Sequence, residues 1–264
     1  MKDTIKDIKC FLLDLDGTVY LGDRPIGSMA ETLGKVRASG RRVVYLTNNS
    51  SKTAAEYTEK LKWLKLWADG AVVYTSGIAA AAFLSSEHKG KSVYIVGTDA
   101  LKDYFRAQGI TLTGDNGEQP DIVMLAYDTS LTYQKLVYAT RYIALGARYF
   151  ATHPDVTCPA PTVFLPDTGS FIALIEACTG KRPEAICGKP FGIMGKTVSE
   201  LLKLSPRQIL MVGDRMHTDM AFAVNNGFMS LLVLSGETTR ADYAASGNKY
   251  DMVLESLNDA VKLL

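Results

Sequence analysis

Two aspartates interrupt an apolar stretch near the start of the chain, in the sequence FLLDLDGTVY at residues 11–20. Asp14 and Asp16 follow a run of apolar residues that is typical of a buried strand. A carboxylate is costly to bury unless it is paired, hydrogen-bonded or bound to a cation. The stretch therefore predicts that a cation or several hydrogen-bond donors compensate these two charges.

Polar residues also follow three other apolar runs. VVYL leads into Thr47, Asn48 and Asn49, AICG leads into Lys189, and ILMVG leads into Asp214, with Asp219 five residues further on. Ligands of parallel sheets bind beyond the carboxyl ends of the strands, so we expect these residues to form one site. Carboxylates, an ammonium and a hydroxyl suit a hard cation and an oxyanion better than a soft metal.

Short apolar runs rich in β-branched residues alternate with helical patterns along the whole chain, which predicts an α/β fold with a parallel sheet. The predicted strands are CFLLD (10–14), RRVVYLT (41–47), AVVYT (71–75), KSVYIVG (91–97), DIVMLAY (121–127), ARYFATH (147–153), QILMVGD (208–214), MSLLVLS (229–235) and YDMVLES (250–256). A helix is predicted over residues 53–66, where apolar residues recur on one face.

Two other readings of these motifs fail on their spacing. An EF-hand loop starting at Asp14 would need glycine where Val19 stands and glutamate where Pro25 stands. The stretch PFGIMGKT imitates a phosphate-binding loop, but Pro190 replaces its first glycine. We therefore expect residues 195–197 to be ordinary helix residues.

The four motifs together resemble those of the haloacid dehalogenase superfamily, most closely its NagD-like or 4-nitrophenylphosphatase-type branch. The resemblance rests on DLDGT at 14–18, LTNNSSKT at 46–53, GKP at 188–190 and GDRMHTD at 213–219. It implies a Rossmann-like parallel-sheet core, formed by residues 1–88 and 184–264, and an inserted α/β cap domain at residues 89–183. The long interval between the second and third motifs leaves room for such a domain.

The resemblance also implies a Mg²⁺-dependent phosphatase that hydrolyses small-molecule phosphate monoesters through a covalent aspartyl-phosphate. Its implied catalytic residues are the nucleophile Asp14, the acid/base Asp16, and Thr47 and Lys189, which stabilise phosphoryl charge. The implied ligands of Mg²⁺ are Asp14, the backbone carbonyl of Asp16, and Asp214. We expect Gly17, Asn48 and Asn49 to bind substrate, and Asp219 to orient Lys189 or a metal-bound water without binding the metal itself.

Two other functions share parts of this pattern. A phosphosugar mutase would carry the same four motifs, but its usual cap lies between the first and second motifs, where this chain is short. A non-catalytic phosphate-sensing module would need neither the acid/base Asp16 nor a large cap. The leaving group stays open, and the cap residues that could face it are Tyr127, Asp128, His153 and Asp155.

Composition limits the partners. The 264 residues carry a net charge of +1, so no global field attracts nucleic acid or a membrane surface. The N-terminal apolar run is too short for a signal peptide or a membrane span, which predicts a cytoplasmic protein. The four cysteines lack metal-ligand spacing, and we expect reduced core residues. The expected partner is a small phosphorylated metabolite, and the sequence leaves a homo-oligomer open.

Overall fold

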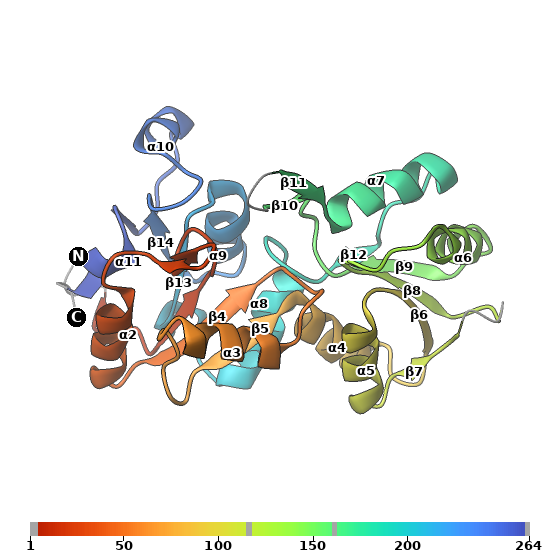
Figure 1. Cartoon of the computed structure of the whole chain (residues 1–264), viewed down its shortest axis with the longest axis horizontal. Coiled ribbons are helices and arrows are strands. Elements are labelled where there is room, and N and C mark those ends of the chain that lie inside the picture. The colour runs from red at the N-terminus through yellow and green to blue at the C-terminus, as the bar shows by residue number, and fades with distance from the viewer. Residues whose placement is uncertain (1–4, 115–117, 160–162, 262–264) are drawn as a thin grey trace. The chain divides into compact units, whose positions relative to one another are not determined.

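The structure is a computed structural model that describes residues 5–114, 118–159 and 163–261. The chain divides into two compact units (Figure 1). The core unit draws on Met1–Thr47, Ala54–Tyr74 and Val198–Leu264, and the second unit on Asn48–Thr53 and Thr75–Thr197. The predicted insertion, residues 89–183, lies inside the second unit, and its boundaries stay a prediction.

A six-stranded sheet in the order β15-β14-β13-β1-β4-β5 forms the centre of the core unit. Strand β1 pairs in parallel with both β4 and β13, so three strand ends that carry predicted site residues are neighbours. Figure 1 shows the red and orange N-terminal strands beside the blue C-terminal strands in this sheet. Two segments far apart in sequence therefore build one carboxyl edge.

The elements of the core unit follow one another along both segments. They are β1 (Cys10–Leu13), β2 (Tyr20–Leu21), β3 (Arg24–Pro25), α2 (Met29–Ala38), β4 (Arg42–Thr47), α3 (Ala54–Trp63), β5 (Val72–Thr75), the 3₁₀ turn η1 (Pro206–Gln208), β13 (Ile209–Gly213), the π-helical turn η2 (Met216–Met220), α9 (Ala221–Asn225), β14 (Met229–Val233), α10 (Arg240–Ser246), β15 (Met252–Leu254) and α11 (Leu257–Ala260).

Alternate residues of the central strands hold the core unit together. Phe11 and Leu13 of β1, Tyr45 of β4 and Val212 of β13 are fully buried on one face of the sheet. They belong to one apolar cluster with residues of α2, α3 and α11. Because side chains alternate between the faces of a strand, this packing fixes the register in which each strand reaches its polar end.

The second unit has its own parallel sheet, in the order β12-β9-β8-β6-β7. Its elements are α4 (Ser76–Glu87), β6 (Ser92–Val96), α5 (Asp99–Ala107), β7 (Thr111–Leu112), β8 (Ile122–Leu125), α6 (Tyr133–Ala144), β9 (Arg148–Ala151), the antiparallel pair β10 (Thr157–Pro159) and β11 (Phe164–Pro166), α7 (Thr168–Thr179), β12 (Ala185–Ile186) and α8 (Gly192–Leu202), which continues into the core unit.

The two faces of this second sheet bury different side chains. Tyr94, Val123 and Tyr149 lie in one apolar cluster with residues of α6 and α7. On the next position of β9, Phe150 makes an edge contact with Phe83 of α4, with 5.4 Å between ring centroids. Both faces are therefore covered by helices, as the long apolar runs of a parallel sheet require.

The α/β prediction is confirmed, and all nine predicted strands are present. The short strands β2, β3, β7, β10 and β11 were not predicted, because two or three residues carry no apolar period and their pairing depends on turns. The helix of residues 53–66 is shorter, Ala54–Trp63, and residues 195–197 lie in α8 as expected.

The cysteine prediction is correct in part. All four cysteines are free thiols, and Cys10 and Cys187 are buried. Cys158 is half-buried and Cys178 is exposed, so the prediction that all four are core residues was wrong for these two. Cys178 lies near the end of α7, on the side of this helix that faces solvent. Across the described ranges, no helix is both long and apolar enough to cross a membrane.

Candidate active site

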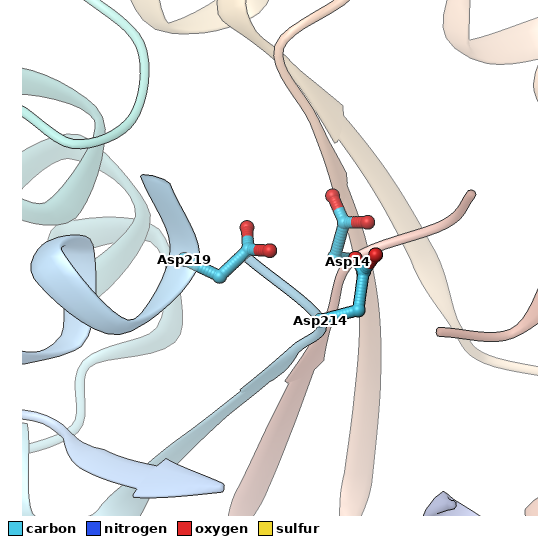
Figure 2. A group of neighbouring side chains, drawn as sticks. All are labelled: Asp14, Asp214 and Asp219. Carbon is cyan, nitrogen blue, oxygen red and sulfur yellow. The ribbon is translucent and has the colours of Figure 1, made fainter. Parts of the chain in front are cut away.

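Three carboxylates meet at the carboxyl edge of the core sheet. Asp14, Asp214 and Asp219 each offer an oxygen, and these oxygens lie within 4.8 Å of one another. Figure 2 shows Asp14 and Asp214 on the ends of neighbouring strands, with Asp219 directed toward them from the turn that follows β13. The predicted proximity of the first and fourth motifs is thus present in the described structure.

Asp14 takes its place from the strand that precedes it. Its backbone N–H donates to the carbonyl of Val212 on β13 at 3.0 Å, which extends the ladder one residue past β1. The side chain is half-buried, whereas Asp16, two residues on, is exposed. The backbone then turns at Gly17, whose φ of +87° favours glycine, and the Gly17 N–H donates to the Tyr20 carbonyl at 2.8 Å.

Asp214 is enclosed by backbone. Its Oδ2 accepts the N–H of Glu237 at 2.7 Å, and its Oδ1 lies 3.5 Å from the donating Thr18 hydroxyl. A Cβ at Gly17 would lie 2.4 Å from Oδ2, and a Cβ at Gly236 would lie 2.0 Å from it. Both positions therefore require glycine if the carboxylate is to stay in place.

The burial of Asp214 beside a second carboxylate raises its proton affinity. Burial, and then the charge of Asp219, raise the pKa of Asp214 to about 6. Both causes act against the ionised form, and a cation among the three carboxylates would favour it. The site therefore carries an excess of negative charge that a cation can offset.

Arg215 supplies part of that compensation from the protein itself. Its Nε lies 2.9 Å from Oε2 of Glu237. Burial opposes its charge, yet the carboxylates of Glu237, Asp14, Asp214 and Asp219 raise its pKa above the ordinary value. The backbone N–H of Arg215 also donates to Oδ2 of Asp219 at 3.2 Å, and this bond orients the Asp219 carboxylate.

Thr47 ends β4 on the same sheet edge and is buried. Its strand pairs in parallel with β1, and Leu13 and Tyr45 form the last residue pair between them. Asp14 and Thr47 therefore both follow this last pair, on the carboxyl side of the sheet. The other predicted residues of the second motif, Asn48 and Asn49, belong to the second unit. Asn49 accepts the Ser51 N–H at 2.9 Å and the Ser51 hydroxyl at 2.8 Å, which closes a turn in this loop.

Lys189 lies in the second unit, after β12, and only 2% of it is exposed. The Asn48 side chain bonds both backbone polar groups of Lys189, so the structure brings the second and third motifs together within this unit. The predicted site residues thus fall into two groups. Asp14, Asp16, Gly17, Thr47, Asp214 and Asp219 lie in the core unit, and Asn48, Asn49 and Lys189 lie in the second unit.

The four cap residues named from sequence differ in their surroundings. Tyr127 and His153 are buried, and Asp128 accepts hydrogen bonds from Lys135 at 2.7 Å and from the Ser130 N–H at 2.9 Å. The side chain of Asp155 is 20% exposed, whereas the side chains of Asp128 and His153 are 0% exposed. The hydrogen bonds from Lys135 and Ser130 show that the Asp128 carboxylate stabilises its own loop.

Comparison with known proteins decides the family. A family model described as haloacid dehalogenase-like hydrolase matches residues 11–111, and a second model of similar description matches residues 186–260. An acid sugar phosphatase of Staphylococcus haemolyticus is 34% identical over 260 residues, which cover 98% of each chain. The chain belongs to the haloacid dehalogenase-like hydrolases.

Solved structures place it in the NagD-like branch of this family. A 4-nitrophenylphosphatase from Thermotoga maritima superposes with a TM-score of 0.92 at 37% identity, covering 98% of both chains. NagD from E. coli K-12 superposes with a TM-score of 0.87 at 28% identity, covering 96% of this chain and 98% of its own. The haloacid dehalogenase-like fold therefore extends over nearly the whole chain.

Several residues of this haloacid dehalogenase-like site were not found from the sequence. Gly236 and Ser235 are two of them, and the Ser235 hydroxyl donates to the Gly17 carbonyl at 2.8 Å. Gly213 was named as part of the fourth motif but without a role, and a Cβ there would lie 2.2 Å from the Cβ of Asp219. For Gly236 and Ser235 the sequence signal was the SGE stretch that follows β14, at another carboxyl end of the same sheet.

Proposed function

We propose that this protein is a Mg²⁺-dependent phosphatase that hydrolyses small phosphate monoesters through a phosphorylated Asp14. The observation that carries the proposal is the cluster of Asp14, Asp214 and Asp219 at the carboxyl edge of a haloacid dehalogenase-like sheet. The phosphatase class is supported by relatives along the full chain, which are described as acid sugar phosphatases and 4-nitrophenylphosphatases.

The donor set fits Mg²⁺. Its side-chain oxygens are hard ligands, and three carboxylates offer them within 4.8 Å of one another. Asp14, Asp214 and the backbone carbonyl of Asp16 would hold the ion, with Asp219 beside them. When bound, Mg²⁺ would neutralise charge on a phosphoryl oxygen and on the attacking carboxylate.

The need for positive charge follows from the reactants. A carboxylate and a phosphate dianion about 4 Å apart repel each other by roughly 8 kcal/mol at an effective dielectric constant of about 20. In the proposal, the Lys189 ammonium offsets part of this repulsion, and the Thr47 hydroxyl donates to a phosphoryl oxygen. The Gly17 N–H donates to Tyr20 and its carbonyl accepts from Ser235, so in the proposal Gly17 shapes the turn beside the phosphoryl group rather than binding it directly.

The reaction divides into two displacements at phosphorus. An Asp14 oxygen attacks phosphorus, the ester P–O bond breaks, and Asp16 gives its proton to the leaving alcohol. Asp16, now a carboxylate, then takes a proton from the attacking water. The bond between phosphorus and the Asp14 oxygen breaks, which releases inorganic phosphate and restores both aspartates.

Sugar phosphates are the substrate class that we propose first. The support comes from the Staphylococcus relatives, which are described as acid sugar phosphatases. The predicted cap, residues 89–183, would then contact the sugar while the core residues carry out phosphoryl transfer. A small phosphorylated metabolite is the partner, and a cytoplasmic location stays a prediction.

Initial rates test this proposal. Purified protein with Mg²⁺ should release nitrophenol from p-nitrophenyl phosphate over many turnovers, and excess EDTA should abolish the release. Ca²⁺ should support much less activity, because its larger and irregular coordination sphere displaces the reacting groups. Stoichiometric binding of phosphate without turnover would instead indicate a sensing module, and isomerised phosphosugar in place of free phosphate would indicate a mutase. A panel of sugar phosphates and other esters would then rank the substrates.

A further inference from the structure

The side chain of Asn48 is paired with the backbone of Lys189. Its Oδ1 accepts the Lys189 N–H at 2.8 Å, and its Nδ2 donates to the Lys189 carbonyl at 3.0 Å. One amide thus bonds both backbone polar groups of a residue 141 positions further along the chain. Asn48 and Lys189 are 6% and 2% exposed, so both bonds are shielded from water.

Asp155 reinforces the direction in which this amide points. The Asn48 Nδ2 also donates to the Asp155 carboxylate, at 3.1 Å to Oδ2 and 3.2 Å to Oδ1. If the amide were rotated by half a turn, its NH₂ group would face the Lys189 N–H, so that two donors would meet. Its oxygen would then face the Lys189 carbonyl and the Asp155 carboxylate, which are both acceptors. The carboxylate therefore favours the one orientation in which Asn48 can hold Lys189.

Gly188, the residue before Lys189, is also held closely in place. Its N–H donates to the Thr152 carbonyl at 2.7 Å. A Cβ at this position would lie 2.6 Å from the Asn48 Oδ1 and 2.8 Å from the Thr152 carbonyl oxygen. The backbone entering Lys189 is therefore packed directly against Asn48 and the end of β9.

The anchoring loop is itself held from within the second unit. The Ser76 hydroxyl donates to the Asn48 carbonyl, and the Ser50 hydroxyl lies 3.1 Å from the Thr152 hydroxyl. Ser50 also accepts the Tyr127 N–H at 2.9 Å. These bonds connect residues 48–53 to the strand ends of the second sheet, so Asn48 has a fixed support.

We propose that Asn48 and Asp155 are positioning residues that act through Lys189. Each polar atom of the Asn48 side chain has a protein partner, which argues for this role rather than for the substrate binding expected from sequence. The inference rests on the proposed function, in which the Lys189 ammonium offsets phosphoryl charge. A backbone held at both its N–H and its carbonyl fixes the origin of the lysine side chain, and a displacement of about 1 Å can cost about 100-fold in rate.

A double-mutant cycle tests the proposal, with kcat and KM measured on p-nitrophenyl phosphate. Asn48→Ala and Asp155→Leu should each lower kcat by about 10- to 100-fold with a smaller change in KM. In a Lys189→Met background, the same substitutions should lower kcat by less than about twofold, because the group on which they act is gone. Asp155→Asn keeps an acceptor for the Asn48 Nδ2, so it should retain most of the wild-type kcat.

Two matched controls separate positioning from general damage. Asn258→Ala removes another amide that bridges backbone and side chains, through Ile26 and Thr32 in the core unit. Asp121→Leu removes another carboxylate of the second unit, which accepts the Ser92 N–H. Both controls should leave kcat within about twofold in folded protein, a change typical of sites away from the reaction. Thermal unfolding confirms that each variant is folded, and Asp155→Leu tests the same prediction if Asn48→Ala does not fold.

The results distinguish a failure of the positioning inference from a failure of the proposed function. If Lys189→Met keeps the wild-type kcat, the role proposed for Lys189 is wrong, and the positioning inference falls with it. A second outcome is that Lys189→Met loses activity, but Asn48→Ala and Asp155→Leu lower kcat by the same factor in the Lys189→Met background as in the wild type. That outcome overturns the positioning inference alone. A loss confined to KM would return Asn48 to the substrate-binding role and would also contradict the inference.

Discussion

Gly17 and Asp214 are in such close contact that a Cβ on residue 17 would lie 2.4 Å from Oδ2 of the aspartate. The two residues are far apart in sequence, yet β1 and β13 are neighbours in the sheet. The glycine turn within the first motif therefore shapes the pocket of the carboxylate from the fourth motif.

This contact makes Gly17→Ala a test of the carboxylate arrangement. We expect the substitution to move Asp214 and to lower both Mg²⁺ affinity and kcat, the latter by about 100-fold. Gly40→Ala is the matched control, since Gly40 has a similar φ of +79° and nothing within 4 Å of its Cβ position. Both variants should lose about 1–2 kcal/mol of stability from backbone strain, but only Gly17→Ala should lose metal affinity in calorimetry. Equal metal affinity in the two variants would contradict the argument.

The raised pKa of Asp214 predicts how metal binding depends on pH. Mg²⁺ needs the ionised carboxylate, and burial with the charge of Asp219 raises the pKa of Asp214 to about 6. The proton and the metal therefore compete, and Mg²⁺ affinity should fall by about tenfold per pH unit below pH 6. Titration calorimetry at pH 5.0, 6.0 and 7.5 measures this slope. A constant affinity across that range would show that the carboxyl does not titrate there.

The same pKa has a consequence for the metal-free protein. A carboxyl whose folded pKa is raised stabilises the fold below its unfolded pKa, and this contribution is lost as the pH rises through the folded value. The metal-free protein should therefore lose stability between about pH 4 and pH 6, and Mg²⁺ should stabilise it more at pH 7.5 than at pH 5. Asp214→Asn should remove most of this pH dependence in thermal unfolding. A variant with an unchanged profile would place the titrating group elsewhere.

Asp16 provides a prediction about roles within one motif. Asp16→Asn should slow both alcohol release and dephosphorylation, by about 100- to 10,000-fold, since it removes the acid/base group. Mg²⁺ affinity should change little, because the proposed ligand is the backbone carbonyl of this residue. Alcohols with a low pKa, such as nitrophenol, should suffer least in the first step, because they leave without a proton. A loss of metal affinity as large as that of Asp214→Asn would contradict this division of roles.

The ion pair of Asp128 and Lys135 predicts an effect on stability rather than on catalysis. The two groups are 2.7 Å apart, and their side chains are 0% and 13% exposed. Lys135→Met should cost about 2–4 kcal/mol, because it leaves a buried carboxylate without its cation. Lys91→Met breaks the exposed pair with Asp121 and should cost less than about 1 kcal/mol. Denaturant unfolding compares them, and equal losses would contradict the argument from burial.

The sequence predicted the strands and the carboxylate cluster because both depend on local patterns. Apolar runs marked β1 and β13, and the rule that parallel strands share a carboxyl edge was enough to predict that Asp14 and Asp214 lie together. The structure confirms that cluster. Asp219, which was expected in the same site, also lies among the three carboxylates.

Other parts of the site depend on tertiary contacts that leave no local pattern. The pairing of Asn48 with the Lys189 backbone joins two loops, and Asp155, in a third segment, accepts a further hydrogen bond from the same amide. Gly236 is needed only because Asp214 packs against it. No motif or periodicity expresses such contacts, so the sequence supplied the residues but not the partners that fix them.

The residue that carries the phosphoryl group during turnover is the most direct measure of the proposed reaction. The protein is mixed with Mg²⁺ and p-nitrophenyl phosphate, the reaction is quenched in acid within the first turnover, and peptides are mapped by mass spectrometry. We expect one phosphoryl group on the peptide that contains Asp14, a nitrophenol burst that does not exceed the enzyme concentration, and neither signal in Asp14→Asn. Steady turnover by Asp14→Asn at a rate near that of the wild type, or a phosphoryl group on another residue, would contradict the proposal.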